Sequence, residues 1–99
     1  MKLKLFTVYD SKAEAYLQPF YAPSTGQAIR SFQETCNTPD HVFFKYPEDF
    51  TIFEMGTFDD ATSIIDTYKT PTSLGKAIEF KQQQQLDLNQ PEMLKSQAS

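Results

Sequence analysis

Apolar residues along the first quarter of the chain follow a strand pattern. Leu, Phe, Val and Tyr dominate residues 2–9, and the polar run Asp10-Ser11-Lys12 follows them. Because Asp and Ser side chains bond to nearby backbone groups in turns, we expect a strand that ends in a hairpin turn. A second strand is expected over residues 15–21. Pro19 cannot donate to a strand ladder there, which indicates an edge strand or a bulge.

Helical spacing replaces the strand pattern after Ser24. Gln27 stands three residues beyond Ser24, the arrangement of a capping box. Ile29, Phe32 and Cys36 then fall at positions i, i+3 and i+7, so they share one side of a helix. We therefore predict a helix that is capped by Ser24, runs to about Cys36 and buries this apolar face.

The second half of the chain repeats the order of strand, strand and helix. Strands are expected over residues 51–58 and 62–68, on either side of an Asp59-Asp60 turn. Thr70-Pro71 predicts a second helix, with Thr as its cap and Pro in the first helical position. Its expected inner face is Leu74, Ala77 and Ile78.

These elements predict an α+β fold, in which a four-stranded antiparallel sheet has two helices on one face and strand-strand-helix occurs twice. A long connection over residues 37–47 separates the two units, and a short helical turn is expected at residues 47–50. We assign residues 1–81 to a single domain. Residues 82–99 contain four consecutive Gln and few apolar groups, so they are predicted to be a disordered tail.

Two stretches of the sequence resemble each other. Residues 23–32 and 71–80 share a Pro, hydroxyl residues, a Gly-polar-Ala-Ile run and a Phe. Tyr9-Asp10 and Phe58-Asp59 precede these stretches at nearly the same distance. Two explanations are open: a pseudo-twofold repeat of the hairpin-plus-helix unit, or similar residues selected by similar local tasks in unrelated segments.

Composition removes most catalytic chemistry. The 99 residues include one Cys, one His and isolated glycines, so a disulfide, a multi-Cys zinc site and a Gly-rich phosphate loop are not expected. Cys36 is expected in the core and His41 on the surface. No apolar run approaches the roughly 20 residues that span a bilayer, and no signal-peptide pattern is present. We therefore expect a non-enzymatic protein of a reducing cytoplasm that needs no metal or cofactor.

The net charge of −4 is unevenly distributed. Residues 1–45 carry five cations against four acids, a net of +1, whereas residues 46–70 carry one Lys against six acids, a net of −5. Aromatic side chains lie among the N-terminal cations, as in proteins that bind single-stranded nucleic acid, although about half of them should be core. The candidates are Lys2, Lys4, Lys12, Arg30 and Lys45 for phosphates and Tyr9, Tyr16 and Tyr21 for stacking on bases.

Six runs of sequence resemble the small nonstructural protein of gokushoviruses, single-stranded-DNA bacteriophages of the family Microviridae. The runs are Tyr9-Asp10-Ser11-Lys12-Ala13, Gln18-Pro19-Phe20, Gly26-Gln27-Ala28-Ile29-Arg30, Pro47-Glu48-Asp49-Phe50-Thr51-Ile52-Phe53, Gly56-Thr57-Phe58-Asp59 and Ser73-Leu74-Gly75-Lys76-Ala77-Ile78-Glu79-Phe80. The resemblance implies an early, non-virion protein of the infected bacterium that binds DNA or aids the switch from duplex replication to single-strand synthesis and packaging.

Two hypotheses of different classes follow. In the first, the chain is an accessory protein in viral single-stranded DNA replication or packaging, and binds single-stranded DNA weakly. In the second, it is a protein-interaction module, and the acidic residues 46–70 and aromatic residues 42–46 dock on the phage replication initiator or a host replication factor. A sheet with helices on one face leaves its other face bare, so we also expect a homodimer through that face or an edge strand.

Overall fold

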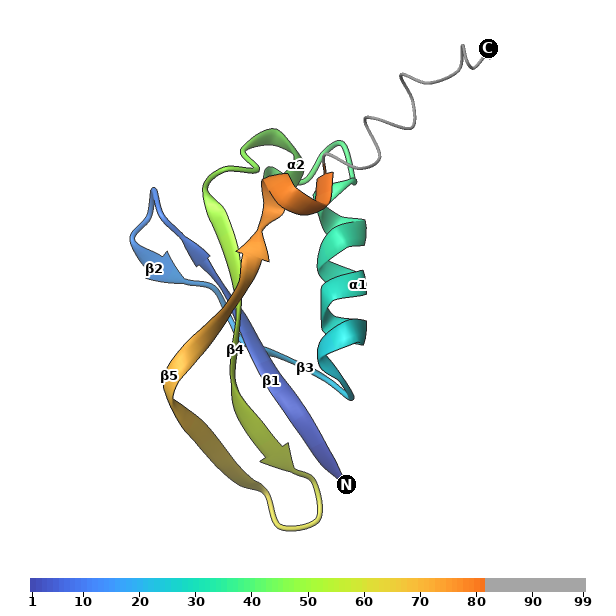
Figure 1. Cartoon of the computed structure of the whole chain (residues 1–99), viewed down its shortest axis with the longest axis vertical. Helices are drawn as coiled ribbons and strands as arrows, with labels where there is room; N and C mark the ends of the chain where they lie inside the picture. Colours follow the sequence, from blue (N-terminus) through green and yellow to red (C-terminus); the bar gives the residue numbers. More distant parts are fainter. Residues whose placement is uncertain (82–99) are drawn as a thin grey trace, which may run out of the picture.

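The computed structural model describes residues 1–81, which form one antiparallel sheet with helices on one side (Figure 1). The predicted tail, residues 82–99, lies outside the described residues. A further helical segment covers residues 77–81. In chain order the named elements are β1 (Lys2–Asp10), β2 (Ala15–Tyr16), β3 (Phe20–Ala22), α1 (Thr25–Cys36), α2 (Val42–Lys45), β4 (Phe50–Asp59) and β5 (Ile64–Lys76).

The sheet is built around β1 and β4, which pair antiparallel along their whole length. β5 pairs with the other side of β4 and forms one edge of the sheet. β2 and β3 both pair with β1 and together form the opposite edge. The predicted α+β class with an antiparallel sheet is confirmed, but the sheet has five strands because the expected second strand is divided in two.

Pro19 lies in the gap between β2 and β3. Since proline has no backbone N–H, it breaks the ladder at this edge. The chain stays attached across the gap through Leu17, whose backbone N–H donates to the carbonyl of Val8 (2.8 Å) and whose carbonyl accepts from the Thr7 hydroxyl (2.7 Å). The predicted strand over residues 15–21 is thus two short strands, and the predicted effect of Pro19 is confirmed.

The two hairpin turns have the same local design. Asp10 Oδ1 accepts from the backbone N–H of Lys12 (3.0 Å), and Asp59 Oδ1 accepts from that of Ala61 (3.0 Å). Each turn ends on a residue in the left-handed region, Glu14 at φ 56° and Ser63 at φ 63°. Both Asp-based turns predicted from the sequence are therefore present, and they are equivalent to each other.

Helix α1 begins and ends as predicted. The Ser24 side chain accepts from the backbone N–H of Gln27 (3.2 Å), and the helix ends at Cys36. Its buried residues are Ala28, Phe32 and Cys36, whereas Ile29 is only half-buried. This face covers Phe6, Val8 and Ile52 of the sheet to make the core.

The second predicted helix is present, but its predicted start at Thr70-Pro71 is wrong. β5 continues through both residues to Lys76, and the helical segment begins at Ala77. β5 is an edge strand, so Pro71 needs no ladder partner on its outer side, and the many Thr residues favour an extended chain. Gly75 has φ +138°, a conformation that side chains rarely adopt, and it directs the chain into the helical segment.

The connection before β4 also differs from expectation. The helix in it is α2 at Val42–Lys45, and residues 47–48 form a turn instead of the predicted helical turn. His41, expected as a surface residue, is half-buried and caps α2, with its Nδ1 accepting from the backbone N–H of Phe43 (3.1 Å). The cap fixes the entry of Phe43 into the core beside Phe32 and Phe50.

The predicted order of hairpin and helix occurs twice: α1 follows the first hairpin, and the helical segment at residues 77–81 follows the β4–β5 hairpin. Residues 23–32 are mostly helix α1, whereas the aligned residues 71–80 are mostly the end of β5. Within the shared Gly-polar-Ala-Ile run, Gly75-Lys76 end β5 whereas Gly26-Gln27 are helical, but Ala-Ile is helical in both halves, and Ala28 and Ala77 are both fully buried.

Candidate nucleic-acid interface

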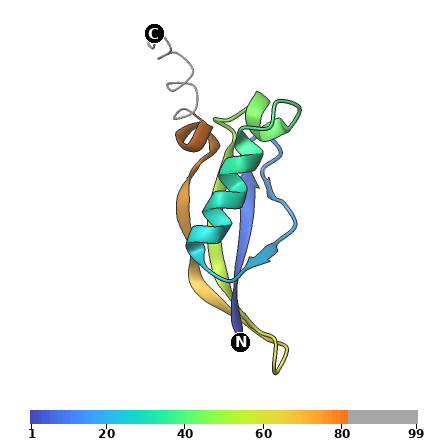
Figure 2. The same cartoon turned by 90° about the vertical axis from the view of Figure 1, so that its right-hand side faces the viewer.

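Among residues 1–81, the helices lie on one face of the sheet and none lies on the other (Figure 1). Side chains alternate between the two faces along a strand, so Phe6 and Val8 point toward α1, while Leu5, Thr7 and Tyr9 point away from it. Figure 2, which looks at the molecule from the side of α1, shows this helix in front of the sheet. We call the side away from α1 the open face.

Aromatic side chains gather on the open face in two groups. The upper platform, as oriented in Figure 1, is Tyr9, Tyr16 and Phe53: the Tyr9 and Tyr16 ring centroids are 4.8 Å apart, and those of Tyr16 and Phe53 are 5.9 Å apart. The lower platform is Tyr21 and Phe58, whose centroids are 5.3 Å apart. All five come from β1, β2, β3 and β4.

Both platforms present tyrosine rings to solvent. Tyr16 is 55% exposed and Tyr21 is 51% exposed, whereas Tyr9, Phe53 and Phe58 are half-buried beneath or beside them. Such rings offer a flat apolar surface at low conformational cost, which is what stacking on an unpaired base requires. The three tyrosines predicted from the sequence are therefore brought to one face.

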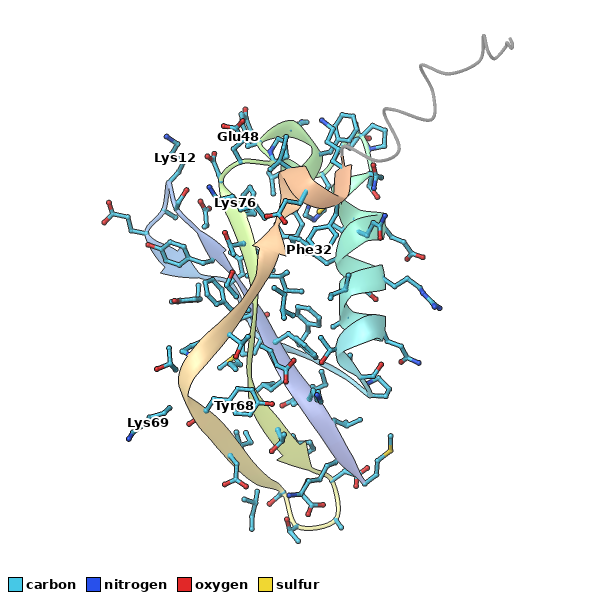
Figure 3. All side chains as sticks on the ribbon, in the orientation of Figure 1. Lys12, Phe32, Glu48, Tyr68, Lys69 and Lys76 are labelled. Atoms are coloured by element: carbon cyan, nitrogen blue, oxygen red, sulfur yellow. The ribbon has the colours of Figure 1, made fainter. Side chains whose placement is uncertain are left out.

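The cations on the open face are mostly not those expected. Lys76 lies opposite Thr51, which in turn lies opposite Tyr9, so Lys76 shares their face. Lys69 points away from α1, and Lys12 extends from the turn between β1 and β2 (Figure 3). Of the predicted phosphate ligands, only Lys12 lies near this group, at the end of the sheet, where it also lines a pocket with Val42, Tyr46 and Asp49.

The other four predicted cations lie on the covered side of the sheet. Lys2 and Lys4 point to the same face as Phe6, and Lys2 stands opposite Asp59. Arg30 is exposed on α1, and Lys45 ends α2. The structure thus separates these four cations from the tyrosines that were grouped with them.

Lys4 belongs to a polar cluster under the start of α1. Glu54 is only 8% exposed; its Oε1 accepts from the Thr25 hydroxyl (2.8 Å) and its Oε2 from the Tyr68 hydroxyl (2.6 Å). Lys4 Nζ lies 3.4 Å from Oε2 of the same carboxylate and donates to Thr25 Oγ1 (3.2 Å). The cluster ties α1, β1, β4 and β5 together.

Burial and hydrogen bonding oppose each other at Glu54. Burial raises the pKa of its carboxyl, but the hydrogen bonds from Tyr68 and Thr25 and the charge of Lys4 outweigh burial, so the pKa lies below the ordinary value. The hydrogen bond that the Tyr68 hydroxyl donates to Glu54 raises the pKa of Tyr68, because the carboxylate favours the protonated phenol. The site is a satisfied ion pair and offers no free acid or base.

The remaining candidates for chemistry are structural. Cys36 is fully buried, and burial raises the pKa of its thiol to about 12, so the thiolate is scarce. Within residues 1–81, no group of three His, Cys, Asp or Glu side chains could hold a metal ion. In the same part of the chain, no helix is long and apolar enough to cross a membrane.

A pocket of about 280 Å³ opens between α1 and the segment joining β2 to β3. Val8, Phe20, Phe32 and Phe43 give it an apolar floor. Its polar lining residues are Gln18, Ser31, Thr35 and His41. The pocket is on the covered side of the sheet, because its floor residues belong to the core.

The family model for the phage ORF5 protein matches residues 3–80. The chain belongs to the phage ORF5 protein family. The match covers all the described strands and helices except Lys2, the first residue of β1, and Lys81, the last residue of the helical segment. No curated protein and no solved structure matches the chain significantly.

Membership of the ORF5 family confirms the phage origin that the resemblance implied, and it assigns no residue a role. Sequence reasoning found the tyrosines of the open face but missed Phe53, Phe58, Lys69 and Lys76. Thr51 pairs with Tyr9, and Phe53 lies two residues after Thr51 on the same face of β4. Strand alternation along β4 would therefore have placed Phe53 on the face of Tyr9. Lys76 could not be found this way, because the sequence predicted a helix there.

Proposed function

We propose that this ORF5-family protein is a non-enzymatic accessory protein that binds single-stranded DNA through the open face during viral DNA replication or packaging. The observation that carries the proposal is the grouping of Tyr16 and Tyr21 with Lys69 and Lys76 on one face, with Lys12 at the end of the sheet beside it. Aromatic rings stack on bases of any sequence, and lysines contact phosphates, so the expected binding is sequence-tolerant.

The proposed setting is a single-stranded-DNA phage of the gokushovirus type, with the protein acting in the host bacterial cytoplasm and absent from the virion. The six matching sequence runs and the ORF5 family match support this context. We propose binding without catalysis because the buried thiol and the paired Glu54 have structural roles in the described residues.

Charge distribution supports DNA binding at this face despite the net charge of −4. Glu54, Asp59 and Asp66 fall on the covered side by strand register: Glu54 pairs with Phe6, Asp59 with Lys2, and Asp66 with Thr57, which pairs with Lys4. The acids of the central sheet therefore point away from the tyrosines. With about three phosphate contacts available, binding should be weak and sensitive to salt.

Two variants with equal charge test the proposal. In the first, Lys12, Lys69 and Lys76 are each replaced by Gln; in the second, Lys2, Arg30 and Lys45 are replaced by Gln. Fluorescence anisotropy with labelled oligo-dT at low salt should show at least a tenfold loss of affinity in the first variant. The second should bind within about threefold of the wild type, because its changes lie on the covered side.

Equal losses in both variants would mean that only net charge matters and would overturn the assignment of the open face. No saturable binding by the wild-type protein at high micromolar concentration would overturn the proposed function. Circular dichroism of both variants confirms that the fold is kept, which is expected because the six side chains are at least partly exposed.

A second candidate function is protein docking at the end of the molecule that carries α2. Val42 is 45% exposed and Tyr46 is 58% exposed, and the acids Glu48 and Asp49 follow them directly. A basic, apolar segment of a replication protein would fit this surface. A pull-down from infected cells after nuclease treatment tests this function. Recovery of the replication initiator with the wild-type protein, and its loss with Tyr46→Ser, would favour the function. Loss of every partner on nuclease treatment would count against it.

We also propose that the protein is a homodimer joined through the β4–β5 hairpin. Residues 61–70 are all exposed, and Ile64, 55% exposed, lies opposite Asp59 on the side away from Tyr21 and Phe58. Pairing there would cover Ile64 and leave the open face free. Sedimentation of the wild-type protein should show a dimer, and Ile64→Ser should dissociate it. A wild-type protein that is a monomer at about 100 μM would contradict the proposed dimer.

A further inference from the structure

The two aromatic platforms are separated along the sheet. Tyr16 pairs with Tyr9, and Tyr21 pairs with Leu5, so the exposed tyrosines are four positions apart along β1. At roughly 3.4 Å per residue, this separation is about 14 Å. Bases stacked as in a duplex strand rise about 3.4 Å each, so neighbouring stacked bases cannot reach both platforms.

Two lysines follow the same direction on β5. Lys76 is level with the upper platform, because its partner Thr51 pairs with Tyr9. Lys69 stands between Thr67 and Thr72, whose partners Gly56 and Glu54 are level with Leu5 and Phe6 in the middle of the sheet. The cations therefore run beside the aromatic rings and not across them.

Between the platforms the open face is small and uncharged. Leu5 is 4% exposed and Thr7 is also 4% exposed, and Gly56 has no side chain. At these three positions there is no exposed ring on which a third base could stack. A strand that crosses this stretch would keep contact through its phosphates, and Lys69 on β5 is the cation level with the crossing.

We propose that the open face binds one extended single strand of DNA at both platforms at once, with unstacked nucleotides between the two stacked bases. The phosphates of that strand follow Lys76 and Lys69 along β5. The inference rests on the proposed function and adds a footprint to it. Once one base is stacked on the first platform, the contact with the second platform is intramolecular, so affinity depends on oligonucleotide length.

The test is a length series of oligo-dT from two to twelve nucleotides, measured by anisotropy or calorimetry at low salt. Wild-type affinity should rise at least tenfold once the strand is long enough to reach both platforms, and only slowly beyond that length. Tyr16→Ala and Tyr21→Ala should each abolish this step and bind long oligonucleotides no better than short ones. Tyr46→Ala, an exposed tyrosine on α2's C-cap, is the matched control and should keep the step.

Three results would overturn the inference. If both variants weakened binding by one factor at every length, the platforms would not be bridged. If only one of the two tyrosines affected binding, the face would hold a single stacking site and the proposed function would stand without the footprint. If the wild-type protein bound no oligonucleotide of any length, the proposed function and the footprint would both fail.

Discussion

At the scale of single residues, Glu54 is the side chain on which most other groups depend. Its carboxylate receives the hydroxyls of Thr25 and Tyr68 and the ammonium of Lys4, so three segments of the chain meet on one charge. A buried carboxylate left without these partners would cost several kcal/mol, whereas with them it holds the three segments together. The pKa of Glu54 lies below the ordinary value, so the stabilisation from these contacts depends on pH.

Glu54→Gln should reduce the free energy of unfolding by about 1–2 kcal/mol at pH 7, because it removes the charge that Lys4, Thr25 and Tyr68 stabilise. The folded-state pKa of Glu54 is lowered, so this stabilisation is present above the unfolded pKa and is lost as pH falls through the folded value. The difference in the free energy of unfolding between wild type and variant, measured with urea, should therefore shrink as the pH falls from about 5 to about 3, the range in which carboxyl groups titrate.

Tyr68→Phe is the control for this variant. It removes one hydrogen bond but keeps Lys4 beside the carboxylate, so the loss at pH 7 should be smaller, about 1 kcal/mol. A wild-type to Glu54→Gln difference that stays constant over the same pH range would contradict the lowered pKa of Glu54.

Cys36 should be unreactive in the folded protein. Its thiol is fully buried and has a pKa of about 12, and the thiolate is the form that attacks disulfide reagents. At pH 8 an aromatic disulfide reagent should label Cys36 only as fast as the protein opens, and the rate should rise steeply in urea below the unfolding midpoint. Complete labelling within seconds in native buffer would show that the site is open.

At the scale of elements, the pairing of β4 with β5 depends on the lack of a side chain at Gly56. A Cβ at this position would lie 2.2 Å from the Asp66 carbonyl oxygen and 2.9 Å from Thr67 Cα, both backbone atoms. The register between the two strands also shifts beside Gly56. The close approach carries β5 past the bulge and brings Tyr68 to Glu54.

Gly56→Ala should therefore lower the free energy of unfolding by about 1–3 kcal/mol, because backbone must move to admit the methyl group. Gly26→Ala is the matched control: nothing lies within 4 Å of its Cβ position in α1, so it should stabilise the protein by about 0.4–1 kcal/mol. Thermal or urea unfolding of both variants decides the matter. Equal effects of the two substitutions would mean that the close contact at Gly56 is relieved without cost.

At the scale of the whole molecule, the division of the sheet into two faces separates charge by function. The paired acids and four of the predicted cations lie on the covered side, while the tyrosines share the open face with Lys69 and Lys76, and Lys12 lies at the end of the sheet. A chain with a net charge of −4 can thus present a cationic, aromatic surface on one side. Long-range repulsion from the acids remains, and salt screens it.

The salt dependence of DNA binding should be shallow. Three lysines on or beside the open face correspond to a slope of about −2 in log K against log salt for single strands. Binding to oligo-dT measured at salt concentrations from about 20 to about 200 mM checks this slope. A slope steeper than about −4 would require more cations than the open face carries, and a slope near zero would mean that phosphates are not contacted.

The sequence by itself determined the parts that depend on neighbours along the chain. The Asp10 and Asp59 turns, the cap at Ser24 and the burial of Cys36 are all local events, because each depends on a side chain bonding its own backbone or on helical spacing. They were enough to predict an antiparallel α+β fold with its helices on one side, and to place three tyrosines in a candidate interface.

Tertiary structure decided what depends on partners distant in sequence. Thr70-Pro71 looks like a helix start, but pairing with β4 extends β5 past it, since strand contacts outweigh a weak local preference. That extension moves Lys76 onto the open face. Lys4 looked like a phosphate ligand, but it faces Glu54, 50 residues along the chain. Which charges share a face follows from strand register, and register is fixed only when the sheet is assembled.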